Sequence, residues 1–167
     1  AGPKDRERVL QEIYALASQW ENPHAVRYFN AWEEKDVVYI QTELCQSTIA
    51  QEWAAAAPLP EERVWRTLAQ AACGLHHMHQ QGVAHLDLKP SNFYVSMSGL
   101  IKIGDFGHAT EATKGALDGV AAGDRRYVSR EVLEGDEEAD LCKADMFSLG
   151  ASILELLGPA RLPPSGA

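Results

Sequence analysis

Cysteine is scarce in this sequence, and long apolar runs and an excess of basic charge are missing from it. The three cysteines, Cys45, Cys73 and Cys142, form no CxxC pair, so the pattern predicts neither a zinc site nor a disulfide framework and fits a reducing, intracellular environment. Against 24 Asp and Glu residues stand only 15 Lys and Arg, and the net charge of -9 argues against nucleic acid or an anionic membrane as a partner. No apolar run is long enough to span a membrane, and the N-terminus has no signal-peptide core.

The 167 residues are 46% hydrophobic, enough for one domain with a sizeable core. Periodicity and turn residues predict helices and strands in a definite order. The expected elements are a helix over 6–20, strands over 25–34 and 36–44 joined by a turn at "EEKD", a short helix and a loop over 45–60, a long helix over 61–81, a strand–turn–strand unit over 93–104, a long functional loop over 105–135 and a buried helix over 145–158. This order indicates an α+β chain with two unequal lobes.

The stretch "HLDLKPSN", followed by "DFG", places chemically useful side chains at the spacing of a phosphoryl-transfer site. Asp87 would accept the proton of a substrate hydroxyl. Asn92 and Asp105 would hold the Mg²⁺ ions that bridge the phosphates of ATP. Lys89 would offset the charge that develops on the transferred phosphate. We therefore expect ATP and Mg²⁺ as cofactors and a protein hydroxyl as the acceptor.

From about residue 6 to about residue 158, the chain resembles the eukaryotic protein-kinase domain. The resemblance implies a truncated two-lobed kinase fold, with part of the small lobe at 1–44 and part of the large lobe at 45–167. The sequence contains neither the glycine-rich loop GxGxxG nor the VAIK lysine that kinases carry before the first helix. We expect a fragment of a longer kinase that, in isolation, binds ATP poorly, has little activity and is marginally stable.

The same resemblance implies roles for residues outside the catalytic loop. Glu12 would pair with the ATP-positioning lysine. The segment beside adenine would have Thr42 as gatekeeper and Glu43 to Cys45 as the hinge. Asp145 would anchor the backbone of the catalytic loop, and Glu131 would occupy the last position of the usual Ala-Pro-Glu, as a buried carboxylate whose usual arginine partner lies in helices that this chain lacks.

Within kinases, "VRYFNAW", "GDFGHAT" and "GDRRY" resemble the Wee/Myt family of mitosis-inhibitory kinases. His108 and the run from Gly123 to Tyr127 are its most distinctive residues. The resemblance implies inhibitory tyrosine phosphorylation of a cyclin-dependent kinase at G2/M, and a place in the nucleus, with the cytoplasm as the alternative. Leu86 stands where most kinases carry an arginine that binds a phosphorylated loop, so we expect activation without such a phosphate.

Two other interpretations stay open. Lys89 belongs to the serine/threonine form of the loop, and "KIGDFG" and "YVS" also resemble kinases of the translation initiation factor alpha subunit. A pseudokinase that acts as a binding scaffold is the alternative from another class.

Overall fold

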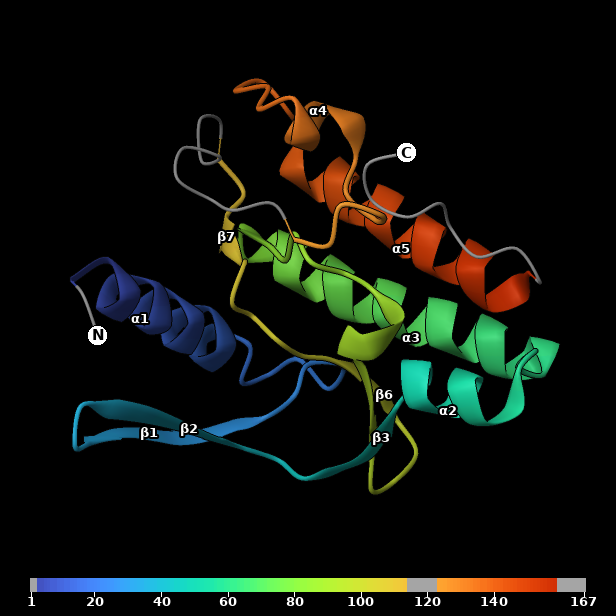
Figure 1. The fold of residues 1–167 in the computed structure, drawn as a ribbon, viewed down its shortest axis with the longest axis horizontal. Coiled ribbons are helices and arrows are strands. Elements are labelled where there is room, and N and C mark those ends of the chain that lie inside the picture. The colour runs from blue at the N-terminus through green and yellow to red at the C-terminus, as the bar shows by residue number, and fades with distance from the viewer. Residues whose placement is uncertain (1–2, 114–122, 159–167) are drawn as a thin grey trace.

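The computed structural model describes residues 3–113 and 123–158, and its chain begins with a helix and a β-hairpin (Figure 1). Helix α1 covers Pro3–Ser18, slightly before the expected range. Strands β1 (Tyr28–Glu34) and β2 (Val37–Thr42) pair in antiparallel fashion, as predicted. Lys35 and Asp36 form their turn with φ of 52° and 62°, a left-handed pair that suits the twist of a two-residue hairpin.

The segment after the hairpin differs from the prediction, because it begins with a strand. Strand β3 (Cys45–Thr48) pairs with a later strand and only then gives way to helix α2 (Ile49–Ala56). Thr48 ends the strand and caps the helix through a reciprocal capping box with Gln51. The predicted strand–turn–strand unit is confirmed as β5 (Phe93–Ser96) and β6 (Ile101–Ile103), and β3, β5 and β6 form one antiparallel sheet.

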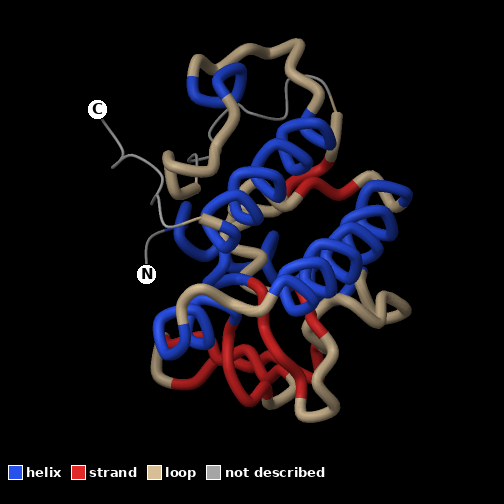
Figure 2. The backbone as a smooth tube through the Cα atoms, turned by 90° about the vertical axis from the view of Figure 1, so that its right-hand side faces the viewer, coloured by secondary structure: helices blue, strands red, loops and turns tan. Residues whose placement is uncertain are grey.

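Helices α3 (Glu61–Gln80) and α5 (Leu141–Leu157) lie side by side and carry much of the core (Figure 1). The long helix predicted over 61–81 is confirmed, and Val64, Leu75 and Met78 lie on its buried apolar face. Figure 2 shows most strands gathered at one end of the molecule, with helices next to them.

Between the long helices, the chain forms short elements. Strand β4 (Val83–Ala84) pairs with β7 (Thr110–Glu111), a 3₁₀ turn covers Pro90–Asn92, and helix α4 covers Arg130–Leu133. The long loop predicted over 105–135 therefore contains a strand and a helical turn within its described part. In the described part of the chain, no helix has the length and apolar character needed to span a bilayer. The chain has a mixed α+β fold.

Candidate active site

A buried carboxylate on helix α5 holds the loop that follows β4. Asp145 is fully buried, and its two oxygens accept the backbone N–H groups of His85 and Leu86 at 2.8 Å each. His79, on helix α3, contacts the same carboxylate through Nε2 at 2.8 Å. Leu86 has φ of 61°, and these bonds help to keep its backbone in that unfavourable region. These contacts agree with the role expected for Asp145, which is to anchor the backbone of the catalytic loop.

His85 joins the loop to the "DFG" segment. Its Nδ1 accepts the backbone N–H of Asp87 at 3.3 Å, and its Nε2 lies 3.2 Å from the carbonyl oxygen of Gly104. Burial lowers the pKa of the imidazole, which fits a neutral ring that donates through Nε2. Phe106 packs edge-on against this ring with centroids 5.3 Å apart, so the two rings link the catalytic loop to the "DFG" segment.

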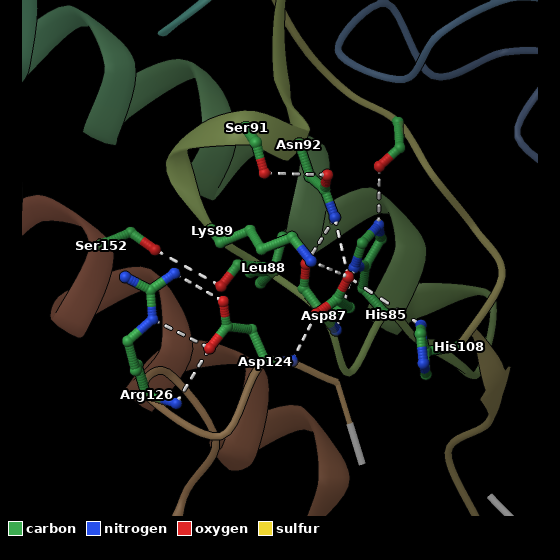
Figure 3. A network of polar contacts seen from close by, with 11 residues as sticks. His85, Asp87, Leu88, Lys89, Ser91, Asn92, His108, Asp124, Arg126 and Ser152 are labelled. Atoms are coloured by element: carbon green, nitrogen blue, oxygen red, sulfur yellow. Dashed lines mark hydrogen bonds and ion pairs between the residues drawn. The ribbon is translucent and has the colours of Figure 1, made fainter. Parts of the chain in front are cut away.

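Asp87 lies at the centre of a polar network (Figure 3). Its side chain is nearly buried, and Oδ2 accepts from Lys89 Nζ at 2.7 Å and from Asn92 Nδ2 at 3.0 Å. Oδ1 accepts the backbone N–H of Asp124 at 2.8 Å. Three donors hold the carboxylate in one orientation, which is the preorganisation a proton acceptor needs.

Asn92 is fixed by the same network. Its Nδ2 also donates to the carbonyl oxygen of Asp87 at 2.8 Å, so the amide nitrogen faces Asp87 and Oδ1 is directed elsewhere. The backbone carbonyl of Asn92 accepts from Gly104 N–H at 3.1 Å, next to Asp105. An amide oxygen beside a carboxylate is a donor set that suits Mg²⁺.

A cleft of about 890 Å³ lies beside this network, between α1, the hairpin and the β3–β5–β6 sheet. It brings together most of the predicted cofactor-binding residues: Glu12, Thr42, Glu43, Cys45 and Asp105. Asp87, Lys89 and Asn92 are not on its lining and form the neighbouring network instead. Tyr94 lines the cleft as well, a residue that the sequence did not single out.

Two carboxylates, those of Glu12 and Asp105, are among the side chains that line this cleft. Burial, and then the charge of Asp105, raise the pKa of Glu12. Gly107 lies next to both side chains, since a Cβ there would be 3.4 Å from Asp105 Oδ1 and 3.8 Å from Glu12 Oε2. Such a pair favours a cation.

The described residues include no cluster of three or more His, Cys, Asp or Glu side chains that could hold a metal ion. Mg²⁺ does not need one, because it keeps several waters and is bound by one or two protein groups together with phosphates. Asp105 and Asn92 are therefore compatible with Mg²⁺ bound to ATP.

Cys45 lines the cleft as a thiol of ordinary or lower reactivity. Burial and the nearby carboxylate of Glu43 raise its pKa, and Lys102 only partly offsets them. The thiolate is the reactive form of cysteine, so this environment does not favour a nucleophile.

The "GDRRY" run meets the catalytic loop, which the sequence did not predict. Gly123 lies so close to Asp87 that a Cβ would overlap its carboxylate. Arg126 forms a fork with Asp124, with distances of 3.0 and 2.6 Å, and lowers the pKa of that carboxyl. The glycine in the run was the only available signal for the close approach.

Tyr127 links the end of the same run to helix α5. It is buried and donates its hydroxyl to the buried carboxylate of Glu155, and burial together with this bond raises the pKa of the phenol. Glu131, in contrast, is only half-buried. The expectation of a buried carboxylate at that position is wrong, because the short helix α4 leaves this side chain at the edge of the fold.

Leu86 is buried in a small apolar cluster with Val128 and Val132, which follow the "GDRRY" run. The side chain that replaces the usual arginine thus packs against the end of the long loop. Apolar packing here joins the catalytic loop to the segment that follows the "GDRRY" run.

The chain matches the model of the protein kinase domain over residues 1–164 and belongs to that family. Among curated proteins, it is similar to Wee1-like protein kinases. It is 37% identical to the one from Arabidopsis thaliana over 162 residues (96% of this chain, 32% of the relative) and 38% identical to the one from Oryza sativa subsp. japonica over 163 residues (98% and 30%). Wee1-like protein kinase 2-B of Xenopus laevis is 35% identical over 187 residues (98% and 33%). The chain spans about a third of the length of these relatives.

Proposed function

We propose that the protein containing this chain is an active protein kinase that transfers the γ-phosphate of ATP to a protein hydroxyl. The observation that carries this proposal is the arrangement around Asp87, where three donors orient one nearly buried carboxylate. A scaffold without activity has no chemical need for this arrangement together with Asn92 and Asp105. The similarity to Wee1-like kinases supports the same assignment.

Each polar group has a distinct task in the proposed reaction. Asp87 accepts the proton of the substrate hydroxyl as that oxygen attacks the γ-phosphorus, and ADP leaves as the bond between this phosphorus and the bridging oxygen breaks. Lys89, already 2.7 Å from Asp87, stabilises negative charge on the transferred group. Asn92 and Asp105 would hold Mg²⁺, which supplies charge neutralisation at the phosphates when ATP is bound. Thr42 and the hinge at Glu43 to Cys45 would bind the adenine side of the cleft.

For the substrate, we propose a cyclin-dependent kinase, phosphorylated on tyrosine first, in the nucleus at G2/M. The support is the similarity to Wee1-like protein kinases together with His108 and the "GDRRY" run. A serine or threonine acceptor remains the second candidate, because Lys89 and its contact with Asp87 follow the serine/threonine form of the loop.

The test uses the full-length protein with ATP and Mg²⁺. It is incubated separately with a cyclin-bound kinase and with initiation factor alpha subunit, and phosphosites are mapped by mass spectrometry. Phosphotyrosine on the cyclin-dependent kinase is the expected result. Phosphoserine on the initiation factor alone would favour the second candidate, and no phosphate on either, with no ATP turnover, would favour a scaffold.

A further inference from the structure

The carboxylate of Glu43, in the hinge segment (residues 43–45), is held from two directions. Its Oε1 accepts the backbone N–H of Arg27 at 2.7 Å and lies 2.7 Å from Lys102 Nζ. The backbone of Glu43 adds a third link, because its N–H donates to the carbonyl oxygen of Arg27 at 2.9 Å. The hinge segment is thus tied to the chain before β1 and to strand β6.

Lys102 connects the same parts from the other side. Besides its ion pair with Glu43, it donates to the carbonyl oxygen of Ala25 at 3.2 Å. The two paired side chains are only 12% and 20% exposed, so water screens their attraction less than at an open surface. The chain beside Ala25 is itself bonded to β6, through Val26 N–H and the carbonyl oxygen of Ile103 at 2.8 Å.

Two residues of the hinge segment lie outside the sheets. Glu43 and Leu44 belong to no strand, and the side chain of Leu44 is 78% exposed. Strand β2 ends at Thr42 and β3 begins at Cys45, so two residues span the change of sheet. Backbone in such a position is free to move unless side chains restrain it.

We infer that Lys102 and Glu43 form a strut that positions the hinge segment for the nucleotide base. Lys102 is then a positioning residue for nucleotide binding, although its own side chain is not on the lining of the cleft. This inference rests on the proposed kinase function, because the hinge segment needs to be ordered only if it binds the base of ATP.

The strut makes a specific kinetic prediction. When only a fraction of molecules has the binding-competent hinge, the apparent affinity for nucleotide falls by that fraction. The proton acceptor Asp87 is held by a separate network, so turnover at saturating ATP is little affected. Loss of the strut should therefore raise KM for ATP and leave kcat nearly unchanged.

The experiment compares Lys102→Met, Glu43→Gln and the double variant in the full-length protein. We expect KM for ATP to rise roughly ten-fold in each single variant, and the double variant to show less than the product of both effects. Lys102→Arg keeps the charge and should restore most of the affinity. Lys143→Met is the matched control, because it removes the same side chain from an exposed ion pair with Asp140.

A second readout does not depend on activity. Hydrogen exchange without nucleotide should become faster at the amides of residues 43–45 in Lys102→Met and remain unchanged in Lys143→Met. Wild-type KM together with wild-type hinge exchange in Lys102→Met would overturn the inference. So would equal losses of kcat, affinity and global stability, which would indicate a purely structural pair. A wild-type protein that does not phosphorylate any substrate, but whose hinge exchange responds to Lys102→Met, would overturn the proposed function and leave the strut supported.

Discussion

Asp87 and Asp105 are two carboxylates of one site in opposite environments. Asp87 is 4% exposed and accepts from three donors of its own chain. Asp105 is exposed, has φ of 63° and faces the carboxylate of Glu12, whose pKa it helps to raise. A buried charge is tolerated only with hydrogen-bond or ionic partners, whereas a solvent-exposed carboxylate is free to bind a cation from solution. The catalytic loop is thus arranged in advance, and the cleft side is arranged for a charged ligand.

The first way to break this comparison is to remove the charge of Asp87 alone. Asp87→Asn keeps the shape of the side chain but loses the proton acceptor, so kcat of the full-length protein should fall about 10²- to 10⁴-fold. Steady-state phosphorylation assays measure the effect. Asp36→Asn, in the exposed hairpin turn, is the control and should retain activity. Near-normal turnover of Asp87→Asn would refute the assignment.

The second test concerns the contacts between Asp145 and the backbone of the catalytic loop. Asp145→Ala leaves the backbone N–H groups of His85 and Leu86 buried without an acceptor, at about 1–3 kcal/mol for each orphaned donor. Urea unfolding should show the loss in the midpoint. Glu137→Ala removes an exposed acidic side chain and should change little. Equal stability of the two variants would mean that Asp145 does not hold the loop.

The third prediction tests the hydrogen bond that links the "GDRRY" run to helix α5. Tyr127→Phe removes the hydroxyl that satisfies the buried carboxylate of Glu155, and we expect a loss of about 1–3 kcal/mol. Thermal or urea unfolding checks it. Tyr14→Phe makes the same change at a side chain that is 71% exposed and should have no measurable effect. A neutral Tyr127→Phe would contradict a supporting role for this bond.

The smallest expected effect is on the cleft side. In the 167-residue chain, whose sequence does not include the lysine expected to pair with Glu12, Glu12→Gln removes like-charge repulsion with Asp105, so stability at neutral pH should rise, by less than about 1 kcal/mol because solvent screens a half-buried charge. The raised pKa means that folding favours the protonated form, and this contribution is present below the ordinary value of 4.5 and lost as pH rises through the folded pKa.

Wild type should therefore approach Glu12→Gln in stability as pH falls toward 4.5, in urea unfolding measured across that range. Glu21→Gln, at an exposed position, serves as the control. A variant less stable than wild type at neutral pH would show that Glu12 has a favourable partner.

The sequence by itself determined the parts of this protein that depend on neighbours along the chain. The long helix, the hairpin and the pair β5–β6 follow from periodicity and turn residues within each segment. The spacing of Asp87, Lys89 and Asn92 was readable because all three lie within one short stretch, residues 87–92, and the resemblance to kinases extended the site to Asp105 and Asp145. Strand β3 escaped prediction because its four residues, "CQST", have no apolar alternation, and pairing with β5 decides its conformation.

Only the tertiary structure decided which distant groups meet. Asp124 reaches Asp87 across 37 residues of chain, and Lys102 reaches Glu43 from another strand of the fold. Such pairs depend on how helices and sheets pack. A sequence pattern does not predict a hydrogen bond between a backbone N–H and a carboxylate that is distant in the chain. The burial that makes Asp87 dependent on its donors, and the exposure that leaves Asp105 open to a cation, are likewise results of packing.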